Sequence, residues 1–368
     1  MRINSLKLIL VVSLFAFGFQ SLCATVAKVK SLENILYVVH IIPGDATNYT
    51  VSKEMSDIEK STRLSIKEFS EKHSSCKFKQ EFTLQTGPET LLYEKVKSIT
   101  ATPGKKAVVG FSRSSLARLA AKAADGSELI GISIGAAADD LKSFNKRFVT
   151  MASPWLEQWK SLLTEMRHSS CSAANTLVIG DVRDSYSFNF RKAAADAGFS
   201  KALIFDSKEV KSSFESMARD AKCVFLAMNI STSQQLFSQL LKSNWKGTIF
   251  GTGDWYFYSG ELKELLHGAK LGDKTRVIVP TGWNPEETKT SKDFTVRLDA
   301  VLGHKPDPNG AYSYDAVQLA LGYLCLDIDP TVFAPEKLSK LNLVRAYKGI
   351  SSGGNYLNPI RLVTFDGQ

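Results

Sequence analysis

Stretches of apolar residues alternate with stretches of helical periodicity along most of the chain. Apolar or alternating runs of strand length lie at residues 34–42, 76–85, 106–111, 128–135, 175–181, 201–206, 222–228 and 247–253. Segments with apolar positions three or four residues apart separate them, at residues 52–72, 90–99, 115–124, 155–167, 186–197, 210–220 and 233–243. The pattern predicts repeated strand–helix units, since its period changes between two and 3.6 residues.

Repeated strand–helix units predict parallel sheets that are covered by helices on both faces. The pattern starts afresh near residue 150, and a chain of 368 residues exceeds one ordinary domain. We therefore expect an α/β protein with two doubly wound parallel-sheet lobes. Polar breaks at residues 281–292 and 349–358 indicate further crossings between the lobes or long loops.

The first 24 residues have the pattern of a secretory signal peptide. Two basic residues precede the apolar run Leu8–Phe19, and small residues follow at Ser21–Ala24, which is the order of a cleaved export signal. The run is too short for a good membrane-spanning helix. We expect an exported, soluble mature chain, and Leu22 before Cys23 disfavours a lipid anchor there.

Four cysteines remain after this cleavage: Cys76, Cys171, Cys223 and Cys325. An even number suits disulfide formation in an oxidising compartment, and four cysteines allow three pairings. We expect the bridge Cys171–Cys223, because both residues precede apolar runs that predict neighbouring strands. Buried free thiols are the alternative.

Composition and motifs exclude several classes of function. The formal charge of +9 is spread along the chain and forms no basic stripe with interleaved aromatics, so we expect no nucleic-acid partner. The five histidines are scattered without metal-ligand spacing, so we expect neither a metal nor another cofactor. No GxSxG elbow, phosphate loop or dinucleotide turn occurs, and we expect no enzyme. A hydrolase that uses a serine of "GFSRS" is the remaining chemical alternative.

Ligands of open parallel sheets bind beyond the carboxyl ends of the strands. In the first half, "VVGFSRSSLARL" places three serines between a strand and a helix: Ser112, Ser114 and Ser115. They could contact a ligand carboxylate with the free N–H groups of a helix start, although capping the helix is the simpler role. The next turn has small residues that allow close approach to its backbone: Gly135, Ala136 and Ala137. A tight turn before a helix capped by Asp139 is the alternative there.

In the second half, Tyr186 and the stretch "GTGDWYFYSGEL" follow predicted strands. Tyr186 could close over a ligand, or pack in the core as buried tyrosines do. Asp254 could hold the ammonium group of a zwitterion, and Trp255 could line a cleft wall. An Asx turn or helix cap is the alternative for Asp254.

Several stretches in a characteristic order carry a resemblance to a known family. They are "VVGFSRSSLARLAAKAAD", "ELIGISIGAAADDL", "RFVTMASPWLEQWKSLLTEM", "TLVIGDVRDSYSFNFRKAAADAGF", "GTGDWYFYSGELKELL", "PNGAYSYDAVQLALGYL" and "RLVTFDGQ". Together they resemble the type 1 periplasmic binding proteins, in particular the branched-chain amino acid (Leu/Ile/Val) receptor-like group of ABC-transporter substrate-binding proteins. The resemblance covers most of the mature chain.

The resemblance implies two lobes joined by three crossing segments that close like a hinge around a small ligand. The N-terminal lobe would comprise residues 25–150 and 281–348, and the C-terminal lobe residues 151–280 and 349–368. The family's ligand contacts correspond to the two turns of the first half, to Tyr186 and the acidic position near Asp254, and to Asn229 or Ile230.

The function implied is periplasmic capture of an amino acid or similar small polar molecule and its delivery to a membrane permease. A ligand sensor or protein-interaction module of the same fold, acting on a membrane receptor or an envelope enzyme, is the alternative. Two departures from the family pattern bear on the ligand. Ala137 stands where a hydroxyl residue is usual, and "IIPGDATNYTVS" replaces a glycine–proline–serine turn.

Overall fold

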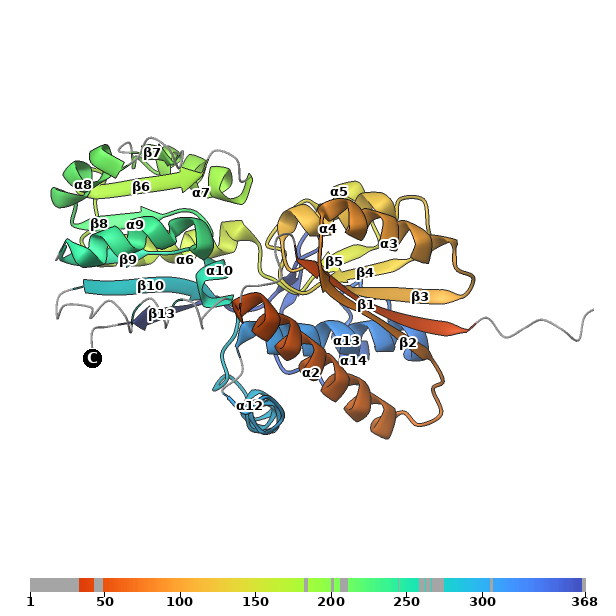
Figure 1. The fold of residues 1–368 in the computed structure, drawn as a ribbon. Coiled ribbons are helices and arrows are strands. Elements are labelled where there is room, and N and C mark those ends of the chain that lie inside the picture. The colour runs from red at the N-terminus through yellow and green to blue at the C-terminus, as the bar shows by residue number, and fades with distance from the viewer. Residues whose placement is uncertain are drawn as a thin grey trace, which may run out of the picture.

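Two sheets, each with its own helices, form the two lobes of the molecule (Figure 1). The structure, a computed structural model, describes residues 33–42, 49–181, 185–199, 202–205, 211–243, 245–257, 262, 266, 275–304 and 307–365. The predicted signal peptide and Cys23 lie outside the described residues. No helix within these described ranges is both long and apolar enough to cross a membrane.

The sheet of the first lobe has five parallel strands in the order β2-β1-β3-β4-β5. The strands are β1 (Asn34–Ile42), β2 (Lys79–Thr86), β3 (Lys105–Gly110), β4 (Ile130–Ser133) and β5 (Phe148–Thr150). Side chains of β1 alternate between the two faces, so Leu36 and Val38 enter one core cluster while Tyr37 and Val39 enter the other. Both faces are therefore buried, which explains why β1 is apolar throughout.

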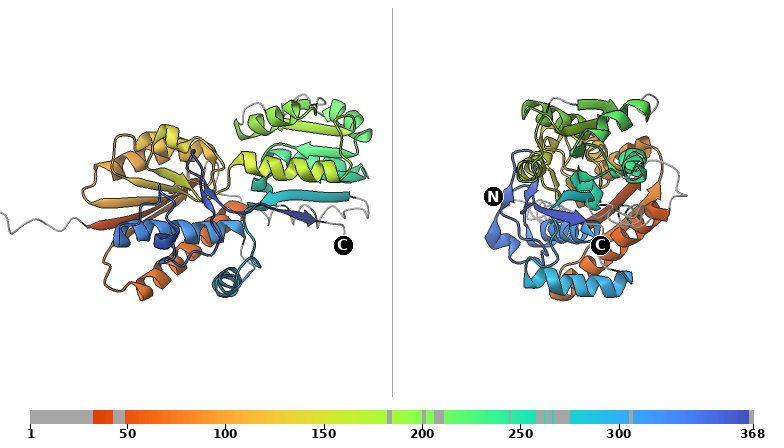
Figure 2. Two further views of the ribbon diagram at one scale, coloured as in Figure 1. Left: turned by 180° about the vertical axis from the view of Figure 1, so that it is seen from behind. Right: turned by 90° about the vertical axis from the view of Figure 1, so that its left-hand side faces the viewer.

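Helices cover both faces of this sheet (Figure 2). The helices of the lobe are α2 (Tyr49–Lys72), α3 (Glu89–Ala101), α4 (Ser114–Ala123), α5 (Leu141–Phe144), α12 (Lys289–Leu302), α13 (Pro308–Leu326) and α14 (Pro335–Leu338). Helices α2 and α13 lie on one face, and α3 and α4 lie on the other. Helix α13 is apolar nearly all round and almost wholly buried, as expected of a helix inside a lobe.

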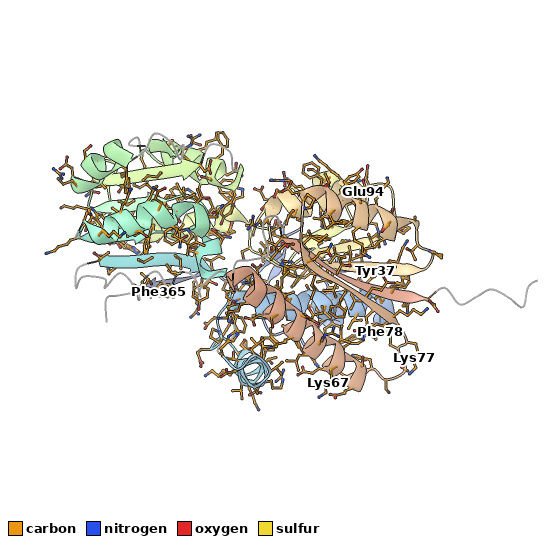
Figure 3. All side chains as sticks on the ribbon, viewed as in Figure 1. Tyr37, Lys67, Lys77, Phe78, Glu94 and Phe365 are labelled. Atoms are coloured by element: carbon orange, nitrogen blue, oxygen red, sulfur yellow. A yellow bond between two sulfur atoms is a disulfide. The ribbon has the colours of Figure 1, made fainter. Side chains whose placement is uncertain are left out.

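The second lobe has a six-stranded sheet in the order β13-β10-β9-β8-β6-β7, in which only β13 is antiparallel to its neighbour. The strands are β6 (Thr176–Asp181), β7 (Ala202–Phe205), β8 (Cys223–Leu226), β9 (Gly247–Phe250), β10 (Thr275–Thr281) and β13 (Arg361–Phe365). Its helices are α6 (Trp155–His168), α7 (Ser185–Asp196), α8 (Lys211–Arg219), α9 (Ile230–Lys242) and α10 (Gly253–Phe257). Tyr37 on β1 and Phe365 on β13 mark the two sheets in Figure 3.

The chain passes between the lobes at residues 151–154, 282–288 and 358–360. The third passage lies about ten residues later than the predicted boundary at 348/349, because β11 (Gly349–Ile350) and β12 (Tyr356–Leu357) stay with the first lobe. The Thr150 amide donates to the Gly354 carbonyl over 2.9 Å. At Gly353 an added Cβ would lie 1.8 Å from the Asp139 carbonyl oxygen. Of the strands described after residue 348, β13 is thus the one that returns to the second lobe.

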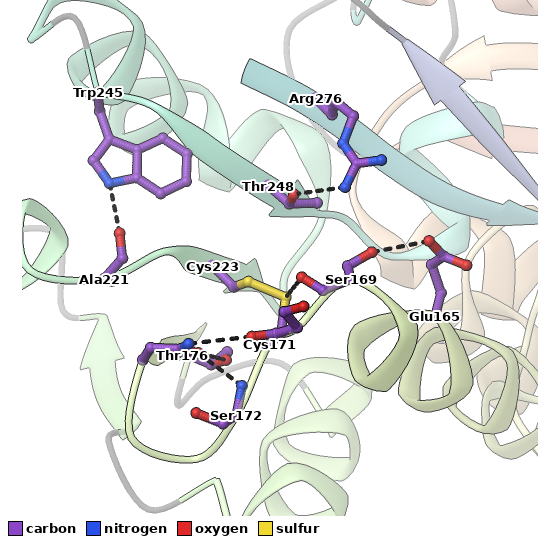
Figure 4. Close-up of a disulfide and its surroundings, with 12 residues drawn as sticks. Glu165, Ser169, Cys171, Ser172, Thr176, Ala221, Cys223, Trp245, Thr248 and Arg276 are labelled. Atoms are coloured by element: carbon purple, nitrogen blue, oxygen red, sulfur yellow. Dashed lines mark hydrogen bonds between the residues drawn. A yellow bond between two sulfur atoms is a disulfide. The ribbon is translucent and has the colours of Figure 1, made fainter. Parts of the chain in front are cut away.

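The described part of the chain contains two disulfides. Cys171 bonds to Cys223 within the second lobe (Figure 4), which confirms the expected pairing. Cys76 bonds to Cys325 and fastens the segment after α2 to the last turn of α13. The alternative of buried free thiols is wrong for these four residues.

Candidate functional site

The turn between β3 and α4 follows a constrained path. At Gly110 an added Cβ would lie 1.7 Å from the Val39 carbonyl oxygen, so only glycine fits beside β1. The next residue, Phe111, is fully buried and has a φ of 63°, in the left-handed region that non-glycine residues seldom adopt. Such strained backbone is concentrated at binding sites. The Ser112–Ser115 segment is thus held by its surroundings and not by its own preferences.

The three serines do not cap α4, contrary to the sequence-based expectation. The helix begins at Ser114, its N-cap residue is Arg113, and no side chain makes a cap hydrogen bond there. Ser112 lies before the cap and is buried, whereas Ser114 and Ser115 are the first two helical residues. The partial positive charge of this helix start is therefore not offset by a capping side chain.

Ser133, at the end of β4, joins this turn to the next one. Its hydroxyl donates to the Phe111 carbonyl over 2.6 Å and accepts from the Ala136 amide over 3.0 Å. The side chain is fully buried. Sequence analysis missed this residue, although a serine ending the apolar run "ELIGISIG" was the available signal.

The turn of Gly135, Ala136 and Ala137 is fixed through its carbonyl groups. Thr150 donates its hydroxyl to the Ala136 carbonyl over 2.7 Å, and the Trp155 amide donates to the Ala137 carbonyl over 3.2 Å. Trp155 begins α6, so this turn is a point where the two lobes meet.

The alternative for this turn, a helix capped by Asp139, is wrong. Asp139 accepts a hydrogen bond from the Trp155 indole over 2.9 Å, and the N-cap of α5 is Asp140. The pair Asp139–Trp155 therefore adds a second contact between the turn and the start of α6.

Tyr186 stands at the start of α7 and is half-buried. Its hydroxyl donates to Gln158 Oε1 over 2.8 Å, and its ring meets Phe190 edge-on at 4.9 Å. Gln158 Oε1 also accepts from the Gly253 amide over 3.2 Å. Residues 182–184 of the preceding turn lie outside the described residues.

Asn229 and Asp254 meet at the start of α9. Asn229 is the N-cap and accepts from the Thr232 amide over 2.9 Å. One carboxylate oxygen of Asp254 accepts from the Ile230 amide over 3.1 Å, and the other accepts from the Thr252 hydroxyl. Asp254 therefore does accept a hydrogen bond from the start of a helix, which was the alternative to a ligand contact. This bond does not prevent Asp254 from contacting a ligand as well.

Trp255 lies in the core and not on a cleft wall. The side chain is fully buried, its indole donates to the Met228 carbonyl over 2.8 Å, and it meets Phe237 edge-on. The prediction that Trp255 contacts a ligand is corrected accordingly. The sequence of an aromatic cluster at a strand end does not tell which of its rings is buried in the core.

Two histidines of the first lobe face carboxylates and not the serine turn. His40 Nε2 lies 3.4 Å from Glu54, and His304 Nε2 lies 3.1 Å from Asp57. Burial raises the pKa of nearby Asp307 to about 7, with smaller contributions from Asp57 and Glu54. Within the described part of the chain, no three His, Cys, Asp or Glu side chains come together as metal ligands.

Comparison with known proteins shows similarity at the level of structure. No family model matches the chain, and no curated protein sequence matches it. The branched-chain amino acid transporter substrate-binding protein LivJ from Streptococcus pneumoniae, in complex with isoleucine, superposes with a TM-score of 0.71 at 11% identity, over 91% of this chain and 97% of that one.

Two further solved structures have other ligands. An ABC-transporter substrate-binding protein from Desulfitobacterium hafniense in complex with leucine gives a TM-score of 0.66 at 15% identity, over 90% of this chain and 98% of that one. A solute-binding protein from R. palustris in complex with benzoate gives 0.64 at 13% identity, over 90% and 92%. The chain therefore has the two-lobed α/β fold of the type I periplasmic binding proteins.

Proposed function

We propose that the protein is a periplasmic solute-binding protein for ABC-type uptake. It captures an amino acid or a similar small polar molecule between its lobes by hinge closure and presents it to a membrane permease. The proposed function is binding with hinge closure and includes no chemical step. The similarity of fold to substrate-binding proteins over nine-tenths of the chain supports the proposal.

The start of α4 is the observation that carries the proposal. It lacks a side-chain cap, its preceding backbone is strained, and Ser133 holds it next to the Gly135–Ala137 turn. A helix start of this kind favours a negatively charged group, and the hydroxyls of Ser114 and Ser115 add hydrogen-bond donors. We propose that a carboxylate binds here.

The second lobe supplies the other half of the proposed site. Tyr186, Asn229 and Asp254 follow β6, β8 and β9, which are adjacent strands of one sheet. Asp254 offers negative charge to an ammonium group, although the Thr252 hydroxyl and the Ile230 amide already bond to it. A carboxylate without an ammonium group, such as benzoate, is therefore the alternative ligand. A sensor or interaction module of the same fold is the alternative function.

Thermal unfolding with L-leucine, L-isoleucine and benzoate tests the proposal. A bound ligand raises the unfolding temperature by mass action, by the equivalent of about 2.7 kcal/mol at a hundred times its Kd. If the ligand is a zwitterion, Asp254→Ala weakens binding far more than it lowers stability, and Ser115→Ala weakens binding of every carboxylate. Thr288→Ala, at a helix start of the first lobe, is the control.

The outcomes separate the alternatives. Stabilisation by benzoate alone assigns a carboxylate site without an ammonium contact. Equal affinity of wild type and Asp254→Ala removes Asp254 from the site. No stabilisation by any amino acid or aromatic carboxylate contradicts solute capture and favours the sensor or interaction module.

A further inference from the structure

We propose that Gln158 is the positioning residue that links the crossing segments to the second-lobe half of the binding site. The proposal rests on the proposed function, because it concerns how hinge closure moves Tyr186 and the turn before Asp254. It follows from one unbroken chain of hydrogen bonds, which begins where the three crossings meet.

The crossings meet at Asn358. Its amide nitrogen donates to the Gly282 carbonyl in the second crossing, and its Oδ1 accepts from the Ser153 hydroxyl in the first crossing over 2.7 Å. Asn358 itself lies in the third crossing. An added Cβ at Gly282 would lie 2.4 Å from the Asn358 amide nitrogen, so the close approach requires glycine there. One side chain thus bonds to both other crossings.

Gln158 continues the chain of hydrogen bonds into the second lobe. Its Nε2 donates to the Ser153 carbonyl over 3.1 Å. Its Oε1 accepts from the Tyr186 hydroxyl over 2.8 Å and from the Gly253 amide over 3.2 Å. Gln158 is therefore bonded to the first crossing, to the start of α7 and to the start of α10.

Burial and steric fit restrict this position to a side chain like glutamine. Gln158, Ser153 and Asn358 are each less than a tenth exposed, where an unmade hydrogen bond is costly. An added Cβ at Gly253 would lie 2.5 Å from Gln158 Oε1. A shorter side chain would not span from Ser153 to Gly253, and an apolar one would leave three polar groups without their bonds.

The chain of hydrogen bonds gives hinge closure a defined effect on the site. A rotation at the crossings displaces Ser153 and Asn358, and Gln158 transmits the displacement to Tyr186 and to the backbone next to Asp254. Tyr186 and Asp254 then move together with the crossing segments. Without Gln158 they would follow the hinge only through the packing of α6.

The first test needs no ligand. Spin labels at Lys67→Cys and Lys192→Cys, exposed residues of the first and second lobes, report the distance between the lobes by double electron–electron resonance. Gln158→Leu should broaden the distance distribution relative to the wild type. Thr164→Ala, on the exposed side of the same helix, should leave it unchanged. Identical distributions for wild type and Gln158→Leu overturn the proposal.

A double-mutant cycle tests whether the effect passes through Gln158. Asn358→Ser and Tyr186→Phe change residues on opposite sides of it. The equilibrium constant for unfolding of the double variant should differ from the product of the two single effects by about threefold or more, as in other hydrogen-bonded networks. In the Gln158→Leu background the double variant should match that product. Ser153→Ala replaces Asn358→Ser if that variant does not fold. Independent effects in both backgrounds overturn the proposal.

Titration with L-leucine separates this proposal from the proposed function. If leucine binds the wild type, Gln158→Leu should weaken its binding at least as much as Tyr186→Phe does. A smaller loss in Gln158→Leu than in Tyr186→Phe contradicts the positioning role. If leucine binds neither protein, leucine is not the ligand, and the distance measurement and the mutant cycle still decide the role of Gln158.

Discussion

The two lobes share one architecture but are stabilised by different contacts. In the first lobe the core contains an ion pair, Arg345–Asp315, at 3.1 Å with both side chains fully buried. In the second lobe the ion pairs Lys160–Glu157 and Lys192–Asp196 lie at the surface. Its core is packed by rings, with Trp159 stacked on Phe225 at 5.7 Å and other rings edge-on around them. The first lobe has ring contacts too, such as Phe294 with Tyr314, and adds the buried ion pair to them.

The difference follows from where the chain passes. Arg345 donates to the Met151 carbonyl in the first crossing over 3.0 Å and lies over the Tyr312 ring at 3.7 Å. Asp315, on α13, accepts from the Val344 amide and the Tyr347 hydroxyl over 2.7 and 2.6 Å. The ion pair thus holds the returning chain against the first lobe next to the hinge. Directional, charge-assisted contacts therefore fix that segment beside the hinge.

The largest expected effect comes from breaking the buried pair. Arg345→Met leaves the Asp315 carboxylate without its partner in the core, and such changes cost about 3–5 kcal/mol. Phe225→Leu in the second lobe should cost less, about 1–3 kcal/mol. Urea unfolding followed by circular dichroism measures both.

Replacement of both charges sharpens the same comparison. The double variant Asp315→Leu, Arg345→Met removes both buried charges and should recover much of the stability lost by Arg345→Met alone. A double variant no more stable than the single one would show that the pair acts through its hydrogen bonds to Val344, Tyr347 and Met151. Burial raises the pKa of Asp315 and Arg345 opposes that rise, so the single variant should lose least at low pH.

Most helices and strands could be predicted from the sequence because their positions show as periodicity. The run "NILYVVHII" predicted β1, and the structure places that strand at Asn34–Ile42. The third crossing was misplaced because β11 and β12 are two residues each, too short to give a periodic signal. Their place in the first lobe depends on backbone contacts at Gly353 and Gly354 that no local pattern encodes.

The site was predictable only as a set of strand ends. The rule that ligands lie beyond carboxyl ends of strands selected turns that the structure places after β3, β4, β6, β8 and β9. It did not reveal that Arg113 is the N-cap of α4 or that Trp255 is buried. Nor did it reveal Ser133 and Gln158, because their roles depend on hydrogen bonds to residues 22 and 95 positions away. Such long-range polar contacts have no sequence period.

The second expected effect is a pH dependence that belongs to the first lobe. Burial, then Asp57 and Glu54, raises the pKa of Asp307 from 3.8 to about 7. The folded state therefore binds a proton more tightly than the unfolded state. The stability that this proton contributes is complete below about pH 4 and is lost as the pH rises to about 7, in all on the order of 4 kcal/mol.

Asp307→Asn isolates this contribution. Asp307 Oδ1 accepts from the Gly310 amide at the start of α13 over 3.3 Å, and asparagine retains that cap without the charge. The free energy of unfolding of Asp307→Asn should therefore fall less than that of the wild type between pH 5 and pH 8. Parallel profiles of the two proteins would contradict the assignment.

The smallest expected effect compares one structural device in both lobes. Thr288 caps α12 and Asn229 caps α9, each by accepting from the amide three residues later over 3.0 and 2.9 Å. Thr288→Ala and Asn229→Ala should each cost about 1 kcal/mol in the free energy of unfolding. Equal losses of unfolding free energy would show that a helix cap stabilises both lobes to the same extent, although their cores differ.

Asn229 is also a proposed ligand contact, and a third variant separates the two roles. Asn229→Ser keeps a capping oxygen on a shorter side chain, so it should restore most of the stability lost in Asn229→Ala. Thermal stabilisation by the compound that binds the wild type then measures the contact. If Asn229 reaches the ligand, Asn229→Ser stays impaired in binding while Thr288→Ala binds normally. Full binding by Asn229→Ser would assign Asn229 to the cap alone and leave Tyr186 and Asp254 as the second-lobe contacts.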